Sequence, residues 1–200
     1  MVKVTIFLEG GGGSAIECRR AFAKLFQDAG LRRPNFPAII ACGSRNEAYK
    51  QFCNEWQVRS DRSLLLLVDS ETRVNGTKWD HVARRPGDQW KSPTGATEDH
   101  LWFMMQCMET WVAADRVTLS TVFRDCLTEN ALPPLVDLEK RSKDDVQTRL
   151  QRATARCPRD RKYEKGRRSY QVVEQLKSDA LSANLPHFQS LIAHLKHLLP

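Results

Sequence analysis

The sequence has no long uncharged stretch. The longest segment without Asp, Glu, Lys or Arg, residues 180–195, is 16 residues, whereas a membrane-spanning helix needs about 20 mostly apolar residues. The chain begins M-V-K-V-T-I-F-L-E-G, so an acidic residue comes too early for the apolar core of a signal peptide. These absences exclude a membrane-spanning helix and predict a soluble, cytoplasmic protein with no membrane partner.

The sequence also lacks any C-x-x-C pair, although it has 6 cysteines. A structural zinc ion is usually held by ligands that come in close pairs, so this absence argues against a zinc site. Several of the cysteines have apolar neighbours, which predicts buried free thiols. The cysteines are Cys18, Cys42, Cys53, Cys107, Cys126 and Cys157.

The glycine run at residues 10–13 is followed by no lysine of the kind that a phosphate-binding P-loop requires. An ATP-binding P-loop is therefore not expected. Glycines without side chains would instead let a phosphodiester backbone approach Glu9 and the start of the next helix. The alternative is a flexible tight turn with no ligand.

The basic excess of this sequence is confined to one segment. Residues 140–170 hold 12 Lys and Arg against 4 Asp and Glu, whereas the rest of the chain holds 19 basic and 20 acidic residues. Such a block favours a polyanionic partner, nucleic acid first. Charge alone is equally compatible with a solvated basic helix.

The first 70 residues predict a β-α-β-α-β order. Leu64 to Val68 is a continuous apolar run, which is typical of a strand buried on both faces of a parallel sheet. This order predicts an α/β fold, an open, mostly parallel sheet flanked by helices. The expected strands are residues 2–8, 37–42 and 64–68, and the expected helices run from Ser14 to Gly30 and from Gly43 through Trp56.

The remainder of the chain predicts a loop, one more strand and then helices. The loop is polar residues 72–98, the strand is residues 101–106, and the helices are residues 107–123, 142–155, 167–176 and 186–199. We expect a Toprim-like α/β domain at residues 1–130 and a helical, basic C-terminal extension at residues 131–200, packed on it.

Acidic residues follow the predicted strands. Glu9 follows the first strand, Asp69 and Glu71 follow the third, and Glu109 comes just past the fourth. In an open parallel sheet, ligands collect outside the carboxyl ends of the strands. Grouped carboxylates repel one another unless protons or a hard divalent cation intervene, which predicts a Mg²⁺ or Mn²⁺ site. Each residue alone is also compatible with a turn or helix-cap role.

Six stretches of the sequence resemble the Toprim domain and a small bacterial family related to it. The motifs are V-T-I-F-L-E-G-G-G, A-C-G-S-R-N-E-A-Y, L-L-L-V-D-S-E, M-Q-C-M-E-T-W-V-A-A-D, S-K-D-D-V and Y-E-K-G-R-R-S-Y. In the Toprim domains of topoisomerases, primases and OLD-type nucleases, a glutamate follows the first strand and a D-x-D pair follows the third. The related RloB-like group is encoded beside ABC-type ATPases in phage-defence loci, so the resemblance implies a similar setting here.

The resemblance implies roles for the acidic residues. Glu9 matches the Toprim glutamate, a metal ligand or general acid/base, and Asp69 matches the first aspartate of the pair, a metal ligand. Glu71 stands where the pattern usually has Asp, and its longer side chain could coordinate through water. Glu109 matches the acidic residue of the family's C-M-E-x-W motif. Its alternative is a helix-start carboxylate favoured by the helix dipole.

The basic residues complete the expected chemistry. Phosphodiester cleavage builds negative charge on the phosphate oxygens, which fixed cations stabilise. Lys143 in S-K-D-D-V and Lys165 in Y-E-K-G-R are the candidate catalytic cations. Each basic residue taken alone also suits a solvent-exposed or helix-flanking position. The candidate nucleic-acid contacts are Arg45, Arg159, Arg161, Lys162, Arg167 and Arg168.

Together, these features predict a Mg²⁺- or Mn²⁺-dependent DNA nuclease. The resemblance implies the effector of a two-gene anti-phage system, working with an ABC/SMC-like ATPase. One alternative is a non-catalytic Toprim-like subunit that binds the ATPase or nucleic acid. A weaker alternative is a phosphotransferase or phosphatase with Asp69 as the nucleophile, a chemistry that normally places its aspartate after the first strand.

Overall fold

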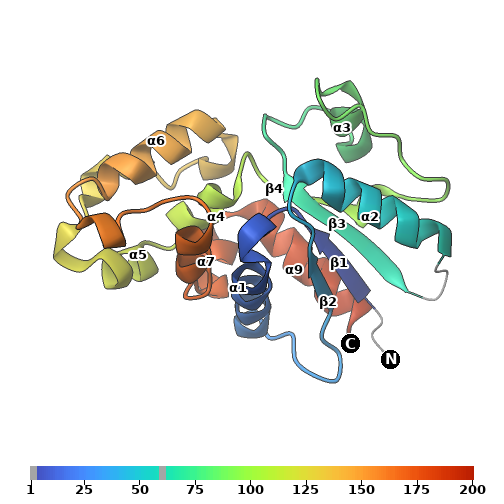
Figure 1. Ribbon diagram of the computed structural model, residues 1–200, viewed down its shortest axis with the longest axis horizontal. Helices are drawn as coiled ribbons and strands as arrows, with labels where there is room; N and C mark the ends of the chain where they lie inside the picture. Colours follow the sequence, from blue (N-terminus) through green and yellow to red (C-terminus); the bar gives the residue numbers. More distant parts are fainter. Residues whose placement is uncertain (1–3, 59–61) are drawn as a thin grey trace.

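A parallel sheet organises the first half of the chain. In the computed structural model, which describes residues 4–58 and 62–200, the sheet has four strands in the order β2-β1-β3-β4 (Figure 1). The predicted α/β fold, an open parallel sheet flanked by helices, is confirmed. Residues 2 and 3 of the first predicted strand lie outside the described residues. The strands are β1 (Val4–Leu8), β2 (Ala38–Ala41), β3 (Ser63–Asp69) and β4 (Leu101–Met104).

Helices cover both faces of the sheet, which explains the apolar run in β3. Leu65 and Leu67 face a core that they share with helix α1 (Ala15–Asp28), whereas Leu64, Leu66 and Val68 face a second core with helix α2 (Arg45–Val58). Successive strand residues point to opposite faces, so a strand covered on both sides needs an apolar residue at every position.

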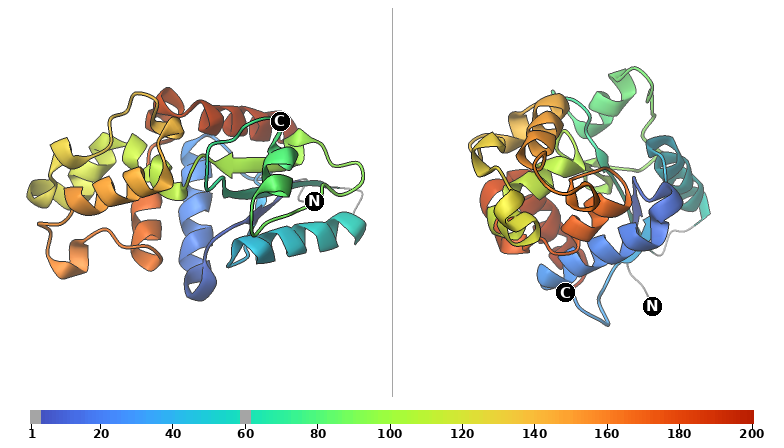
Figure 2. Two further views of the ribbon diagram at one scale, coloured as in Figure 1. Left: turned by 90° about the horizontal axis from the view of Figure 1, so that it is seen from above. Right: turned by 60° about the vertical axis from the view of Figure 1, so that its left-hand side comes forward.

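The C-terminal helices continue the core on the α1 side of the sheet. Helix α7 packs on α1, and α9 packs on β4. Figure 2 shows α9 running along the sheet, while α5 and α6 lie at the end of the molecule away from it. The division at residue 130 stays a prediction. These helices are α4 (Met108–Ala114), α5 (Arg116–Phe123), α6 (Lys143–Ala153), α7 (Arg167–Val173), α8 (Ser178–Asn184) and α9 (Pro186–Leu198). No helix in the described part of the chain is long and apolar enough to cross a membrane.

Three predicted elements differ from the structure. The expected loop at residues 72–98 contains helix α3 (Lys78–Arg84), which begins where the Thr77 side chain accepts a hydrogen bond from the Asp80 N–H. The expected helix at 107–123 is two helices, because the Asp115 carboxylate caps α5 by accepting from the Thr118 N–H. The short helix α8 had not been expected at all. In the first two cases a capping side chain was the local signal.

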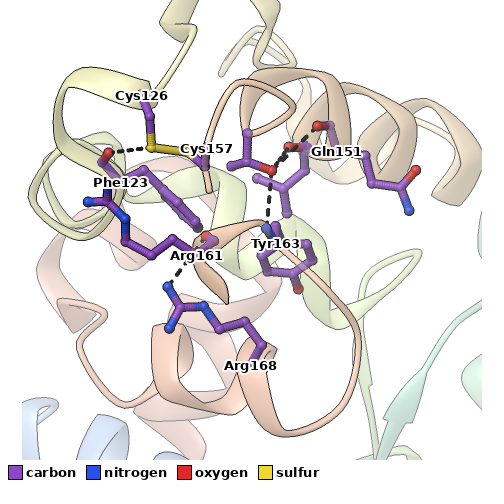
Figure 3. The surroundings of a disulfide bond; sticks show 9 residues. Phe123, Cys126, Gln151, Cys157, Arg161, Tyr163 and Arg168 are labelled. Carbon is purple, nitrogen blue, oxygen red and sulfur yellow. Dashed lines mark hydrogen bonds between the residues drawn. A yellow bond between two sulfur atoms is a disulfide. The ribbon is translucent and has the colours of Figure 1, made fainter. Parts of the chain in front are cut away.

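Two cysteines correct the prediction of free thiols. Cys126 and Cys157 form a disulfide with Cα atoms 4.9 Å apart (Figure 3). The bond joins the chain after α5 to the turn after α6, across 31 positions of sequence. The prediction is wrong for this pair because only packing brings the two segments together. Among the described cysteines, Cys18, Cys42 and Cys107 are buried and free.

Candidate functional site

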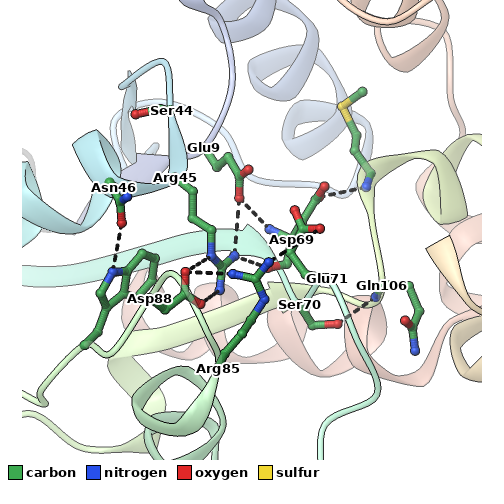
Figure 4. A network of polar contacts seen from close by, with 12 residues as sticks. Glu9, Ser44, Arg45, Asn46, Asp69, Ser70, Glu71, Arg85, Asp88 and Gln106 are labelled. Atoms are coloured by element: carbon green, nitrogen blue, oxygen red, sulfur yellow. Dashed lines mark hydrogen bonds and ion pairs between the residues drawn. The ribbon is translucent and has the colours of Figure 1, made fainter. Parts of the chain in front are cut away.

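Three carboxylates meet at the carboxyl end of the sheet. Each of Glu9, Asp69 and Glu71 offers an oxygen, and these oxygens all lie within 4.8 Å of one another (Figure 4). Strands β1 and β3 are neighbours in parallel register, so Glu9 and Asp69 leave the sheet side by side. The predicted convergence of these strand ends is confirmed. Among the described residues, this carboxylate triad is a group that could hold a metal ion.

Backbone geometry holds the triad in place. The Asp69 N–H donates to Glu9 Oε2 at 2.9 Å, which ties the first carboxylate to the end of β3. Asp69 Oδ1 in turn accepts from the Met108 N–H at 2.8 Å, at the start of α4. Glu71 has a φ of 66°, a left-handed conformation that a glutamate rarely adopts and that often marks a functional site.

Burial makes this grouping electrostatically costly. Asp69 is 9% exposed, and burial followed by the charge of Glu9 raises its pKa well above the usual value. Burial also raises the pKa of Glu9, although the charge of Arg45 and the hydrogen bond from Asp69 lower it. Desolvation disfavours the charged form of a carboxyl group, so the site favours either a proton or a nearby cation.

Lys143 supplies one such cation. Its Nζ lies 2.7 and 2.8 Å from the two Glu71 oxygens and 3.5 Å from Asp69 Oδ2. It is the first residue of α6, which Ser142 caps by accepting from the Asp145 N–H. Burial lowers the pKa of Lys143, but the charges of Asp69 and Glu71 together raise it by more than burial lowers it. The net shift in pKa is upward, so the ammonium stays charged. The structure thus places this predicted catalytic cation at the triad.

Arg45 supplies a second cation at the triad. Its Nη1 lies 3.4 Å from Glu9 Oε2 and also bonds the Asp69 carbonyl oxygen, while its Nε and Nη2 contact Asp88 at 2.8 and 2.7 Å. The side chain is only 10% exposed. Arg45 was predicted to contact nucleic acid, but these bonds engage its guanidinium inside the cluster.

Glu109 lies beside the triad but outside it. It is 3% exposed, one residue into α4, and accepts a hydrogen bond from Gln147 at 3.1 Å. Its charge contributes to the raised pKa of Asp69, which places it within electrostatic reach. The group of oxygens within 4.8 Å does not include it. The helix-start interpretation of Glu109 therefore fits its position, and its metal role stays a prediction.

The remaining predicted basic residues are placed elsewhere. Arg167 pairs with Glu17 at 3.2 Å, and Arg168 bonds Gln171 and the Arg161 carbonyl oxygen near the disulfide (Figure 3). Lys165 is exposed in the turn before α7. In the described residues, no hydrogen bond or ion pair joins any of this set to the triad. The set is Arg159, Arg161, Lys162, Lys165, Arg167 and Arg168.

Sequence reasoning missed two charged residues beside the triad, Asp88 and Arg85. Asp88 bridges Arg45 and Arg85, with Arg85 Nη1 at 2.9 Å from Asp88 and Arg85 Nη2 at 3.9 Å from Glu71 (Figure 4). Both residues lie in the segment that was expected to be a loop, and no local pattern marks them. The capping residue Thr77 was the local signal that this segment contains a helix.

Tyr170 is a further residue that sequence reasoning missed, and its hydroxyl packs against the first two glycines of the turn. Its hydroxyl accepts a hydrogen bond from the Gly11 N–H at 2.7 Å. A Cβ on Gly10, where φ is 124°, would come within 2.6 Å of the same hydroxyl oxygen. By contrast, a Cβ on Gly12 or Gly13 would meet no described atom within 4 Å. Close packing therefore requires the first of these glycines, and the last two face open space.

The family of the chain follows from a scan against family models, in which residues 11–196 match the model described as "Domain of unknown function (DUF4276)". The chain belongs to this family. Comparisons with curated proteins and with solved structures find no match. Asp69, Glu71 and Lys143 lie within the segment matched by the DUF4276 model, and Glu9 lies just before it.

Proposed function

We propose that this member of the DUF4276 family is a metal-dependent nuclease of the Toprim type. One observation carries the proposal: the carboxylate oxygens of Glu9, Asp69 and Glu71 lie within 4.8 Å of one another at the carboxyl end of a parallel sheet. That edge is where open α/β sheets bind their ligands. The Toprim-like motifs of the sequence place a glutamate and an acidic pair at the same two strand ends.

The residues at the triad suit Mg²⁺ or Mn²⁺. All three offer carboxylate oxygens, the donors that these hard cations prefer. A divalent cation would also offset the burial and the repulsion by Glu9 that raise the pKa of Asp69. Glu9, Asp69 and Glu71 would hold the metal, which when bound would polarise a phosphodiester and activate water.

The chain's own residues would position the phosphate and balance its charge. Lys143 is close enough to the triad to stabilise negative charge that develops on the phosphate oxygens. Arg45 is fixed by Asp88 and holds Glu9 in place, which makes it a positioning residue. Asp69 is oriented by the start of α4, which binds its Oδ1 and leaves its Oδ2 facing Lys143 and the other carboxylates.

We further propose that the nuclease is the effector of a bacterial anti-phage system and works with an ABC/SMC-like ATPase. The resemblance to RloB-like proteins of phage-defence loci supports this setting. DNA is the proposed substrate. It has the polyanionic backbone that the basic segment at residues 140–170 favours.

A specific observation favours the non-catalytic alternative. Lys143 and Arg45 already place two cations on the three carboxylates. A cluster neutralised in this way is stable without a metal. In that case the protein would be a Toprim-like scaffold that binds the ATPase or nucleic acid and cuts neither.

The variant Asp69→Asn separates the two functions. Asparagine keeps an oxygen that can accept from the Met108 N–H, so the fold is retained, but the anionic ligand is lost. We expect calorimetry to show Mg²⁺ or Mn²⁺ binding to the wild type and not to the variant. We also expect DNA cleavage and phage protection beside the ATPase gene to be lost, since removal of an essential group commonly costs several orders of magnitude in rate.

The matched control is Asp125→Asn, the same change at an exposed aspartate of the chain after α5. It should leave metal binding, cleavage and protection at wild-type levels. Full phage protection by Asp69→Asn at matched expression would refute the nuclease proposal and favour the scaffold.

A further inference from the structure

A hollow lined by arginines adjoins the triad. It has a volume of about 490 Å³ and lies between the chain that follows β3 and helix α3. Its lining includes Arg73, Arg84, Arg85 and His81. His81 Nε2 lies 2.9 Å from the carbonyl oxygen of Ser70, the residue between Asp69 and Glu71. The wall of the hollow is therefore fixed directly to the strand end that carries the triad.

The charge of this hollow is of one sign. Three arginines line it, and no carboxylate is among its described lining residues. Arg85 is engaged with Asp88 and lies 3.9 Å from Glu71, so it spans the rim between the hollow and the triad (Figure 4). The side chain of Arg84 is 79% exposed, and its single ion pair among the described residues, to Asp80, is long at 3.9 Å. Arg73 is exposed and forms no ion pair with any described residue. Two of the three guanidinium groups are thus available to an anion.

A neighbouring hollow reaches the Glu71 side of the triad. A second hollow of about 380 Å³ shares Thr72 and Arg73 with the first and is also lined by Glu71 and Lys143. An extended anion bound at Arg73 would therefore lie next to the hollow that Glu71 and Lys143 line. Arginine binds phosphate oxygens through paired N–H groups, which suits a phosphodiester better than an isolated halide.

We infer that the hollow of Arg73, Arg84 and Arg85 binds a phosphate of the nucleic-acid backbone that flanks the phosphodiester at the triad. This inference rests on the proposed function and names a substrate contact outside the predicted basic segment. Arg73 lies on the β3–α3 connection and Arg84 ends α3, whereas Arg159, Arg161 and Lys162 follow Cys157 of the disulfide in the sequence.

A second basic hollow provides the matched control. It has a volume of about 770 Å³ and is lined by Arg32 and Arg33, both exposed, together with Asp28 and Glu174. Asp28 ends α1, whose other end begins beside the glycine turn, so this hollow lies about 20 Å along the helix from the triad side. Its lining also includes Lys24 and Lys177, which pair with Glu174 and Asp28, whereas no described carboxylate lines the arginine hollow, so this hollow is a weaker site for a polyanion.

The experiment measures DNA binding without cleavage. A short labelled DNA duplex is titrated with protein in EDTA, and fluorescence anisotropy gives Kd at several salt concentrations. We expect the double variant Arg73→Ala/Arg84→Ala to bind about tenfold more weakly, with a log–log salt slope shallower by about one, because the loss of one phosphate contact removes about 0.9. The double variant Arg32→Ala/Arg33→Ala should stay within about twofold of the wild type.

The outcomes distinguish this inference from the proposed function. Unchanged binding and salt slope in Arg73→Ala/Arg84→Ala, or an equal loss in Arg32→Ala/Arg33→Ala, would overturn the inference even if Mg²⁺ supports cleavage. The expected loss of binding, combined with no cleavage in Mg²⁺ or Mn²⁺, would retain the arginine hollow and overturn the nuclease. A wild type that does not bind DNA at all would overturn both.

Discussion

The ammonium of Lys143 stands where a divalent cation would also bind, and replacing Lys143 by methionine tests this overlap. Methionine keeps an unbranched side chain of similar length and a good helix propensity at the start of α6, but it removes the positive charge. Glu71 then loses contacts of 2.7 and 2.8 Å, and Asp69 loses one of 3.5 Å. The triad is left with Arg45, which contacts Glu9, and with Arg85, which lies 3.9 Å from Glu71.

The size of the effect follows from the burial of these groups. The side chains of Lys143, Glu71 and Asp69 are 22%, 19% and 13% exposed. Breaking a fully buried ion pair costs about 3–5 kcal/mol and losing a surface pair about 0–1 kcal/mol, so we expect the variant to lose about 2 kcal/mol. For a chain of this size, that loss lowers Tm by roughly 4–8 °C.

A metal ion should restore this stability. At a hundredfold excess over its Kd, a ligand that binds only the native state adds about 2.7 kcal/mol. Mg²⁺ or Mn²⁺ should therefore raise the Tm of Lys143→Met more than that of the wild type, in which Lys143 competes for the same oxygens. Thermal unfolding with and without metal measures both shifts.

The control and the refuting results are direct. Lys140→Met removes a lysine that pairs with Asp137 at the surface, so its Tm and its metal response should match those of the wild type. If Lys143→Met melts at the wild-type temperature without metal, the ion pairs do not stabilise the fold as argued. If Mg²⁺ and Mn²⁺ leave its Tm unchanged, the triad does not bind these cations.

Two further predictions concern groups away from the triad. Burial raises the pKa of Glu139 from 4.5 to about 7, although hydrogen bonds from the start of α9 oppose this shift. Between these pH values the native state keeps a proton that the unfolded state has lost. The free energy of unfolding therefore falls as pH rises from 4.5 to 7. Glu139→Gln has no titrating group at this position. In urea unfolding, its stability relative to the wild type should therefore increase by about 2 kcal/mol between pH 5 and pH 8. A stability difference that stays constant over this pH range would contradict the raised pKa of Glu139. Reducing the Cys126–Cys157 disulfide releases a loop of 31 positions and should cost about 3 kcal/mol, whereas dithiothreitol should leave Cys157→Ser, which has no such bond, unchanged.

The sequence by itself was sufficient to predict the sheet and to place Glu9 and Asp69 at neighbouring strand ends. The apolar run in β3 and the order of strands and helices predicted a parallel sheet covered on both faces, because strand periodicity is a local property that short segments carry. Parallel strands end at one edge, so Glu9 and Asp69 could be placed together before any contact was known. Capping residues such as Thr77 also marked a helix locally, although that signal was overlooked.

Only the tertiary structure decided what surrounds these carboxylates. Lys143 reaches Glu71 across 72 positions of sequence, and Arg45 reaches Asp88 across 43. Cys126 and Cys157 likewise meet only through the packing of the segments that follow α5 and α6. Side-chain pairs of this kind depend on the distance and rotation between packed elements, which local periodicity does not encode. The sequence therefore determined where the acidic site would be, and packing determined which cations share it.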